Sequence, residues 1–283
     1  MLQFNFGMHV SKGENMARSI EKNLDIYNFK VTQIFTHGPR SKNRTKMNYT
    51  EVKEAKGLEK IYVHSSYLTN PWGNIKKNKT IAHAIDQFKI AKKIGALGVV
   101  LHIPKIDAKE VAYGMRILAD ELKVAGVVLG PNFKIILEMK ALKAHKTKSY
   151  ETPEKISGLI KELKEVKLGP NEIGICIDSA HIYASQAQIR NYNDAKKYID
   201  ALEDEWIYLI HLNGNEYDST TRAGDKHAIP LSREDKLWGK TKYNESGCRA
   251  FLEYAQKINI DVILEAKSHH TQKQIKAFLA KVR

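Results

Sequence analysis

The sequence predicts an α/β protein, a (β/α)8 TIM barrel in which residues 1–283 form a single domain. Eight short apolar runs rich in β-branched residues recur along the chain, and most gaps between them carry apolar residues at three- and four-residue intervals. Several runs are continuous rather than alternating, which indicates strands buried on both faces and therefore parallel. Parallel strands that alternate with helices favour a closed barrel, which typically needs about 250 residues.

Continuous apolar sequence is clearest in two of the central strands, at Val99-Val100-Leu101 and Ile135-Ile136-Leu137. The full set of predicted strands is Leu2–Val10, Val31–Thr36, Ile61–His64, Gly98–Ile103, Lys134–Glu138, Ile173–Asp178, Trp206–Leu212 and Asp261–Glu265.

Helical periodicity fills the gaps between these strands, and Thr152-Pro153-Glu154 is a good helix start, with a capping threonine followed by proline. The second gap holds only a short helix, near Tyr49 to Ala55. The other predicted helices are Asn15–Tyr27, Thr80–Ile94, Lys109–Val124, Glu154–Val166, Asn193–Leu202, Glu245–Lys257 and Thr271–Val282.

An open, doubly wound sheet is the alternative arrangement of these elements. The sequence carries no Gly-rich phosphate loop after its first strand, which argues against a dinucleotide-binding fold. We also find no internal repeat, low-complexity tract or linker, so the sequence favours one barrel.

The charge of the chain favours a polyanionic partner. Lys and Arg number 46 against 32 acidic residues, a net charge of +14, which suits DNA or RNA, although a solvated lysine-rich surface is the simpler reading. Only two cysteines occur, no apolar run approaches the roughly 20 residues of a membrane span, and the N-terminus lacks a secretory pattern. We therefore expect a reducing intracellular compartment and no membrane partner.

The most informative pattern is the type of residue that ends the predicted strands. In a β/α barrel the C-terminal strand ends surround the active-site mouth, so these side chains converge on one region. Imidazoles and carboxylates together suit zinc or manganese, and carboxylates left unpaired there would repel one another. The six strand-end residues are His64, His102, Glu138, Asp178, His211 and Glu265.

Three further candidate ligands lie in the loops beyond these strands. His181 follows Asp178 by three residues, and the segment Asp225-Lys226-His227 can place Asp225 and His227 on one side of an extended chain. A lone His or Glu at a strand end is usually structural, but nine candidate ligands on one rim are harder to dismiss.

Several sequence blocks resemble the endonuclease IV family of apurinic/apyrimidinic endonucleases. The sharpest is Gly174-Ile175-Cys176-Ile177-Asp178-Ser179-Ala180-His181, and the blocks that contain His64, His211 and Glu265 are also similar. The likeness runs from the Gly7-Met8-His9-Val10-Ser11 block to Glu265. Gly38-Pro39-Arg40 and Tyr67-Leu68-Thr69-Asn70-Pro71-Trp72 resemble divergent members from large DNA viruses.

The resemblance implies three zinc ions per chain, with manganese as an alternative at one or more sites. His64, His102 and Glu138 match the first set of ligands, and Glu138 bridges to a second set completed by Asp178, His211 and Glu265. His181, Asp225 and His227 match the third set.

The implied reaction is hydrolysis of duplex DNA on the 5′ side of an abasic site, which leaves a 3′-hydroxyl and a 5′-deoxyribose phosphate. Metal-bound water can attack at neutral pH, and Glu138 and Glu265 are the catalytic residues that position or deprotonate it. We expect a monomer in the cytoplasm, the nucleus or a viral replication site.

Contacts to DNA are expected from loops that leave the C-terminal strand ends. The resemblance places Arg40, Tyr67 and Leu68 at the lesion, although Tyr67 packed on Trp72 is the structural alternative. The other residues expected to contact DNA are His9, Lys140 and Lys143, and basic side chains also follow the second strand at Lys42, Arg44 and Lys46.

The chain departs from the family pattern in two segments. Met139-Lys140-Ala141-Leu142-Lys143 replaces the usual Asn-Thr-Ala-Gly-like sequence, and Ala228-Ile229-Pro230-Leu231-Ser232 replaces Ser-Leu-Gly-x-Gly. Lys226 also stands where an arginine is usual. These changes retain the ligands but put DNA contacts and turnover in question.

Two other functions fit the sequence less well. A sugar isomerase or epimerase uses similar barrels and strand-end ligands, but it typically needs one or two metals and has no use for cationic loops. A nucleic-acid-binding protein without catalysis is argued against by the complete ligand sets.

Overall fold

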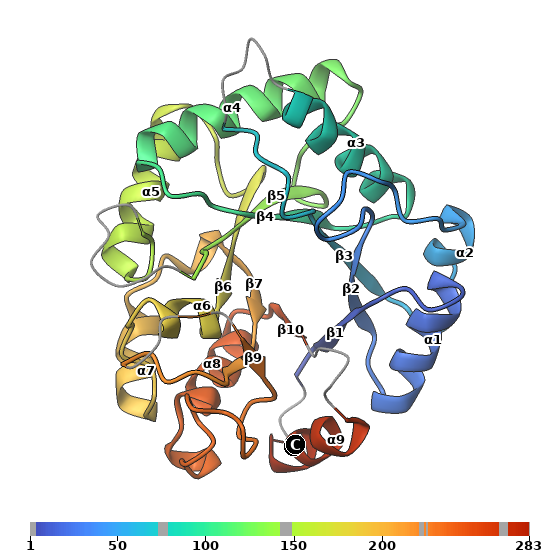
Figure 1. The fold of residues 1–283 in the computed structure, drawn as a ribbon. Helices are drawn as coiled ribbons and strands as arrows, with labels where there is room; N and C mark the ends of the chain where they lie inside the picture. Colours follow the sequence, from blue (N-terminus) through green and yellow to red (C-terminus); the bar gives the residue numbers. More distant parts are fainter. Residues whose placement is uncertain are drawn as a thin grey trace. The chain divides into compact units, whose positions relative to one another are not determined.

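The computed structural model describes residues 4–72, 79–141, 149–220, 224, 226–265 and 271–282. Eight strands form a closed barrel in the order β1-β10-β7-β6-β5-β4-β3-β2, as the sequence predicted (Figure 1). The barrel strands are β1 (Phe6–Val10), β2 (Val31–Phe35), β3 (Lys60–His64), β4 (Gly98–His102), β5 (Lys134–Glu138), β6 (Ile173–Asp178), β7 (Ile207–His211) and β10 (Asp261–Leu264).

The chain falls into two compact units. The N-terminal unit comprises Gly7–Glu138 and Gly158–Ile175, and the C-terminal unit comprises Met1–Phe6, Met139–Ser157 and Cys176–Arg283. Within the N-terminal unit β1 to β5 pair in parallel, and this register sets His102 opposite Glu138. Within the C-terminal unit β10 pairs in parallel with β7, which sets Ile263 opposite His211.

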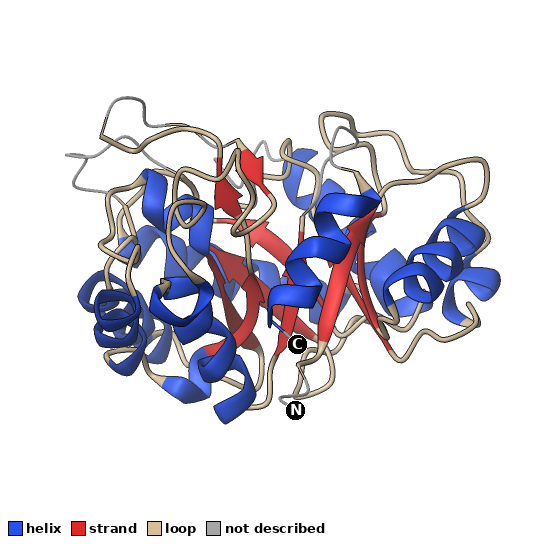
Figure 2. Ribbon diagram, turned by 90° about the horizontal axis from the view of Figure 1, so that it is seen from below, coloured by secondary structure: helices blue, strands red, loops and turns tan. Residues whose placement is uncertain are grey.

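Helices follow the barrel strands in the alternation that the sequence predicted. In Figure 1, α1, α3 and α4 lie outside strands β2 to β5. Figure 2 shows helices in blue and strands in red in a second orientation. The helices are α1 (Met16–Tyr27), α2 (Tyr49–Lys53), α3 (Lys79–Lys93), α4 (Ala108–Val124), α5 (Pro153–Glu165), α6 (Ser179–Ala184), α7 (Tyr192–Asp200), α8 (Gly247–Lys257) and α9 (Gln272–Val282).

Local sequence explains where these helices begin and end. The Asn15 side chain accepts a hydrogen bond from the Arg18 backbone N–H at the start of α1, and Asn28 ends that helix in the left-handed conformation. At α4, Asp107 and Glu110 form a capping box. These caps satisfy backbone groups that a helix leaves without intrahelical partners.

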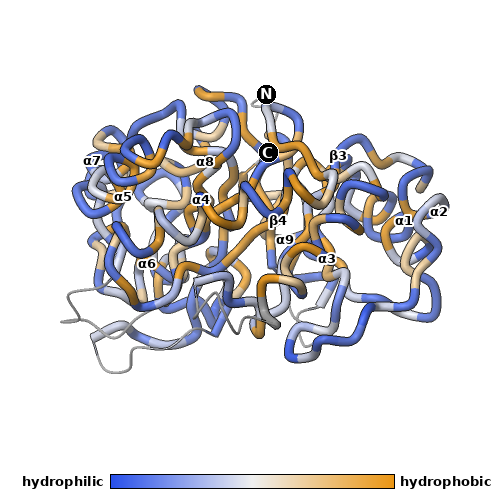
Figure 3. The backbone as a smooth tube through the Cα atoms, turned by 90° about the horizontal axis from the view of Figure 1, so that it is seen from above, coloured by the Kyte–Doolittle hydropathy of each residue, from blue (hydrophilic) through white to orange (hydrophobic). Residues whose placement is uncertain are grey.

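Apolar side chains at helical spacing bury one face of each helix. In α1 the buried residues are Met16, Ala17, Ile20, Leu24 and Tyr27, which recur at three- and four-residue intervals. Hydrophilic and hydrophobic positions accordingly mix along the helices in Figure 3. Among the described helices none combines the length and apolarity needed to cross a bilayer.

Two short strands were not predicted. β8 (Gly214–Asn215) and β9 (His227–Ala228) pair antiparallel in the segment after β7. The short helix α6 begins directly after β6 and carries the candidate ligand His181, and β9 carries His227.

Candidate metal centre

Three candidate ligands converge in the N-terminal unit at the ends of β3, β4 and β5. The Glu138 carboxylate oxygen Oε2 lies 3.1 Å from His64 Nε2 and 2.9 Å from His102 Nε2. Glu138 is fully buried, His64 is nearly so, and the candidate ligand atoms of all three lie within 4.8 Å of one another. This donor set of two imidazoles and one carboxylate suits zinc.

Backbone contacts fix the ring orientation of His64. Its Nδ1 lies 2.8 Å from the Ser65 carbonyl oxygen, an acceptor, so the hydrogen of the neutral ring belongs on Nδ1. Nε2, the nitrogen that faces Glu138, is then left with a lone pair for a metal ion. This is the usual outer-shell arrangement for a histidine ligand.

The C-terminal unit brings together five candidate ligands, namely Asp178 and four residues around it. His181 and His227 form one group with Asp178, and His211 and Glu265 form a second group with the same carboxylate. Asp178 Oδ2 lies 3.6 Å from His227 Nε2 and 3.9 Å from His211 Nδ1, and His211 Nδ1 lies 3.6 Å from Glu265 Oε1. These separations are long for hydrogen bonds, whereas two ligands of one tetrahedral zinc lie roughly 3.4 Å apart. Asp178 can therefore serve both groups.

The Met139 backbone orients His181. His181 Nδ1 lies 2.8 Å from the Met139 carbonyl oxygen, which leaves Nε2 for a metal. Asp178 also accepts a hydrogen bond from the His181 backbone N–H at 3.0 Å and so begins α6. The segment after Glu138 departs from the family pattern but still supplies the acceptor for the His181 ring, because that acceptor is a backbone carbonyl.

Asn213, which the sequence reasoning did not single out, bridges two of the candidate ligands. Its amide nitrogen Nδ2 donates to Asp178 Oδ2 at 2.8 Å and to Glu265 Oε2 at 3.3 Å, and its Oδ1 accepts from the Glu265 backbone N–H at 3.0 Å. The side chain is buried. It lies two residues after His211, but a neutral amide at that place carries no pattern that marks it in the sequence.

The residues expected to contact DNA differ in their exposure and in the side chains that they pack against. Arg40, Tyr67 and Leu68 are exposed, and the Tyr67 ring stacks on His102 with centroids 5.4 Å apart. Trp72 donates from Nε1 to the Val111 carbonyl instead, so it packs on α4. Gly114 permits that approach, because a Cβ there would lie 2.3 Å from the Trp72 ring.

His9 and the basic residues after β5 complete these assignments. His9 is partly buried, with its ring 4.6 Å from Phe35 and 6.3 Å from His64. Lys140 is exposed. Asp225 and Lys143 lie outside the described residues, so the placement of both stays a prediction.

A buried carboxylate organises the segment after β7, which carries His227. Asp235 accepts backbone hydrogen bonds from Asn215 and Leu237 at Oδ1 and from Leu231 at Oδ2, at 2.8 to 3.1 Å. Leu231 has a φ of 60°, a left-handed conformation unusual for leucine, in the segment that departs from the family's glycines. Gly214 allows the close approach, since a Cβ there would lie 2.4 Å from the Asp235 carboxyl carbon.

Asp235→Ala is expected to lower the free energy of unfolding by about 3 kcal/mol, because it leaves buried N–H groups without an acceptor. Urea denaturation after chelation measures this without a contribution from metal binding. Asp120, an exposed carboxylate on α4, is the control, and its alanine variant should change stability little. Equal, small effects of the two variants would show that Asp235 does not organise the segment.

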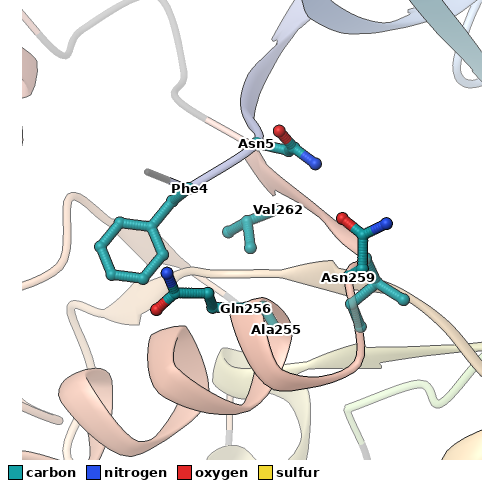
Figure 4. Close-up of a pocket in the computed structure, with 7 residues that line it drawn as sticks. Phe4, Asn5, Ala255, Gln256, Asn259 and Val262 are labelled. Carbon is teal, nitrogen blue, oxygen red and sulfur yellow. The ribbon is translucent and has the colours of Figure 1, made fainter. Parts of the chain in front are cut away.

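A pocket of about 260 Å³ lies beside Val262, near the start of β10 (Figure 4). The side chains of Phe4, Asn5, Gln256 and Asn259 line it, and its described lining residues carry no charge. It offers no acid, base or metal ligand, so it is not a candidate active site.

Comparison with known proteins agrees with this arrangement. Residues 25–240 match the family model described as xylose isomerase-like TIM barrel, and the chain belongs to that family. That description by itself leaves a sugar isomerase open. A probable AP endonuclease of African swine fever virus is 31% identical over 249 residues, which cover 84% of this chain and 79% of the viral protein. The chain belongs to the endonuclease IV family of AP endonucleases.

Other relatives extend this assignment. A probable endonuclease 4 from Petrotoga mobilis is 27% identical over 282 residues, which cover 94% of this chain and 91% of that protein. The crystal structure of AsfvAP:AG superposes with a TM-score of 0.81 at 24% identity, covering 98% of this chain and 96% of the other, which is a likeness of fold. This AP endonuclease family member is thus part of a metal-dependent hydrolase family, and it carries candidate metal-binding groups.

Proposed function

We propose that this protein hydrolyses the phosphodiester 5′ to an abasic site in duplex DNA and leaves a 3′-hydroxyl and a 5′-deoxyribose phosphate. The observation that carries the proposal is the pair of buried imidazole and carboxylate clusters, one in each unit of the chain. Membership of the AP endonuclease family supports the choice of substrate.

The proposed cofactors are three zinc ions, with manganese as an alternative at one or more sites. His64, His102 and Glu138 hold the first, Asp178, His211 and Glu265 the second, and His181, Asp225 and His227 the third. The sharing of Glu138 between the first two ions rests on the family resemblance. Bound zinc supplies a nucleophilic water at neutral pH and charge that stabilises the scissile phosphate.

The side chains of the protein orient this chemistry. Glu138 and Glu265 position or deprotonate the attacking water, and Asn213 orients the Asp178 and Glu265 carboxylates. The hydrogen bonds of His64 and His181 to backbone carbonyls keep their remaining ring nitrogens toward the metal positions.

The proposed partner is duplex DNA with an abasic site, bound by a monomer. Arg40, Tyr67 and Leu68 contact the lesion, and His9, Lys140 and Lys143 also contact the DNA. The net charge of +14 and the exposure of Arg40, Tyr67 and Leu68 support this arrangement. We place the activity in a reducing intracellular compartment, and the free, buried cysteines Cys176 and Cys248 agree with that.

The deciding experiment is incubation of the purified protein with a duplex that carries one tetrahydrofuran abasic analogue. The analogue cannot undergo β-elimination, so a cut on its 5′ side reports hydrolysis. A chelator should abolish the cut, and re-added zinc should restore it. Isomerisation of a free sugar without any cut would favour the isomerase alternative.

Metal analysis is expected to find about three ions per chain, zinc above all, because eight of the nine proposed ligands are described and gather in groups that could hold a metal ion. Elemental analysis of undenatured protein measures this number. A protein with at most one tightly bound ion would contradict the three-metal arrangement.

Arg40→Ala and Tyr67→Ala are each expected to lower the preference for abasic over intact duplex by about tenfold. A side chain that stacks in the gap is worth roughly 1–3 kcal/mol when it is truncated. Paired binding titrations at fixed salt measure the preference, and metal content should not change. Equal losses for damaged and intact DNA would mean that these residues only hold the backbone.

A further inference from the structure

The loop after β2 has a closed backbone structure with Arg40 near its tip. The Thr45 N–H donates to the Thr36 carbonyl at 2.8 Å, and the Gly38 N–H donates to the Asn43 carbonyl at 3.0 Å. We call residues 36–45 the arginine loop. Its conformation is therefore fixed on both sides of Arg40, whose side chain is exposed.

Asp86 on α3 holds the base of the arginine loop. The Arg44 guanidinium donates to both carboxylate oxygens of Asp86, with Nε at 2.7 Å from Oδ2, and Nε2 of the fully buried His37 lies 3.1 Å from Oδ2. Burial alone would raise the pKa of Asp86, but the hydrogen bonds and charge of Arg44 and His37 hold it below its ordinary value. A bidentate pair of this kind is among the stronger charge-assisted contacts.

Gln87, the next residue of α3, holds the loop after β3. Its Oε1 accepts from the Ser66 backbone N–H at 2.8 Å, and its Nε2 donates to Thr69 Oγ1 at 2.6 Å. We call residues 65–69 the tyrosine loop, because they carry the exposed Tyr67. Gln87 is fully buried, so its amide spans the loop from the protein side.

The two loops are also joined to each other. The Tyr67 backbone N–H donates to the Pro39 carbonyl at 2.8 Å, and the Ser66 hydroxyl donates to the Ser41 carbonyl at 3.0 Å. The two acceptors, Pro39 and Ser41, flank Arg40, and Tyr67 itself is a donor. The distance between the Arg40 and Tyr67 side chains therefore depends on the contacts that hold both loops to α3.

We infer that Asp86 and Gln87 are positioning residues that set the preference for abasic over intact duplex by holding Arg40 and Tyr67 in a fixed relation. This inference rests on the proposed function. Holding two loops in the bound arrangement before DNA arrives removes an ordering cost from binding. Side chains held in one arrangement can enter the gap at an abasic site but are blocked by stacked bases in intact duplex. The gain in binding free energy is therefore larger for abasic duplex.

Arg44 acts in this arrangement as an internal anchor. The sequence grouped it with basic residues that contact DNA, but its guanidinium is committed to Asp86. An anchor and a phosphate contact have different signatures. Loss of a phosphate contact flattens the log–log salt slope by about 0.9 and weakens both duplexes alike, whereas loss of an anchor lowers the preference and leaves the slope unchanged.

The test uses Arg44→Gln, Asp86→Asn, their double variant and Gln87→Met in the metal-loaded full chain. Binding is titrated against intact duplex and against a tetrahydrofuran duplex with a non-hydrolysable 5′ linkage, at several salt concentrations. Arg116→Gln is the matched control, because Arg116 forms the same kind of pair with Asp120 on α4. Cleavage kinetics on the ordinary tetrahydrofuran duplex are measured in parallel.

Each single variant should lower the abasic preference about three- to tenfold. The double variant should lose little more than either single variant, because both remove one interaction. KM should rise while kcat stays near wild type, metal content and salt slope should not change, and Arg116→Gln should behave as wild type.

The inference is wrong if wild type discriminates but the variants discriminate equally well, or if Arg44→Gln weakens both duplexes alike and flattens the slope. If buried Gln87→Met fails to fold, the Arg44 and Asp86 variants decide. A wild-type protein that neither cuts nor prefers the abasic duplex overturns the proposed function, and the inference falls with it.

Discussion

Glu138→Ala should reduce hydrolysis at the abasic analogue by about 10³-fold or more. Glu138 is fully buried at the end of β5 and lies within hydrogen-bonding distance of His64 and His102. Its removal leaves the His64 and His102 imidazoles without their carboxylate and, in the proposed centre, takes a shared ligand from two ions. The expected loss is therefore in kcat.

Single-turnover cleavage and metal analysis of the same preparation measure this loss. Lys140→Ala is a useful control, because Lys140 lies two residues away and is exposed. It should alter binding and salt dependence but not the metal content. A folded Glu138→Ala protein that kept a tenth of the wild-type rate would show that Glu138 is not an essential ligand.

Asn213→Ala should cost about 10- to 100-fold in metal affinity or activity, the usual effect of removing a side chain that orients ligands. Its amide donates to both Asp178 and Glu265, so its removal takes one orienting hydrogen bond from each carboxylate. Asn213→Asp should be no better. It keeps an acceptor for the Glu265 N–H but sets a third carboxylate beside two others.

Competition with a chelating dye measures the affinity of each variant for zinc. Asn191, whose side chain caps α7, is the control for loss of an asparagine hydrogen bond. Its alanine variant should lose about 1 kcal/mol of stability without a change in metal affinity. If the Asn213 and Asn191 variants bound zinc equally well, Asn213 would have only a structural role.

The sequence predicted the barrel because its strands are continuous apolar runs. The predicted bounds of β5 and β6 match the structure, and most other strands differ by one residue at either end. The short strands β8 and β9 were missed because two residues carry no periodicity. The clustering of the candidate ligands within each unit was predictable because strand ends in a parallel barrel converge, so the residue types at those ends point to a site.

Residues that orient the ligands were not predictable in the same way. Asn213 is a neutral amide with no spacing pattern, and the contact of Met139 uses its carbonyl, which every residue has. Arg44 was instead grouped with the basic residues near DNA because its charge is evident in the sequence. Its partner could not be predicted, since Asp86 lies 42 residues further along the chain.

The Met139 carbonyl, which lies within hydrogen-bonding distance of His181 Nδ1, belongs to a segment in which this chain departs from the family pattern. A backbone carbonyl accepts a hydrogen bond whatever side chain its residue carries. The side chain there can therefore change without loss of this contact, as long as the backbone conformation is kept. At position 139 we therefore expect an apolar side chain of another kind to leave the orientation of the His181 ring unchanged.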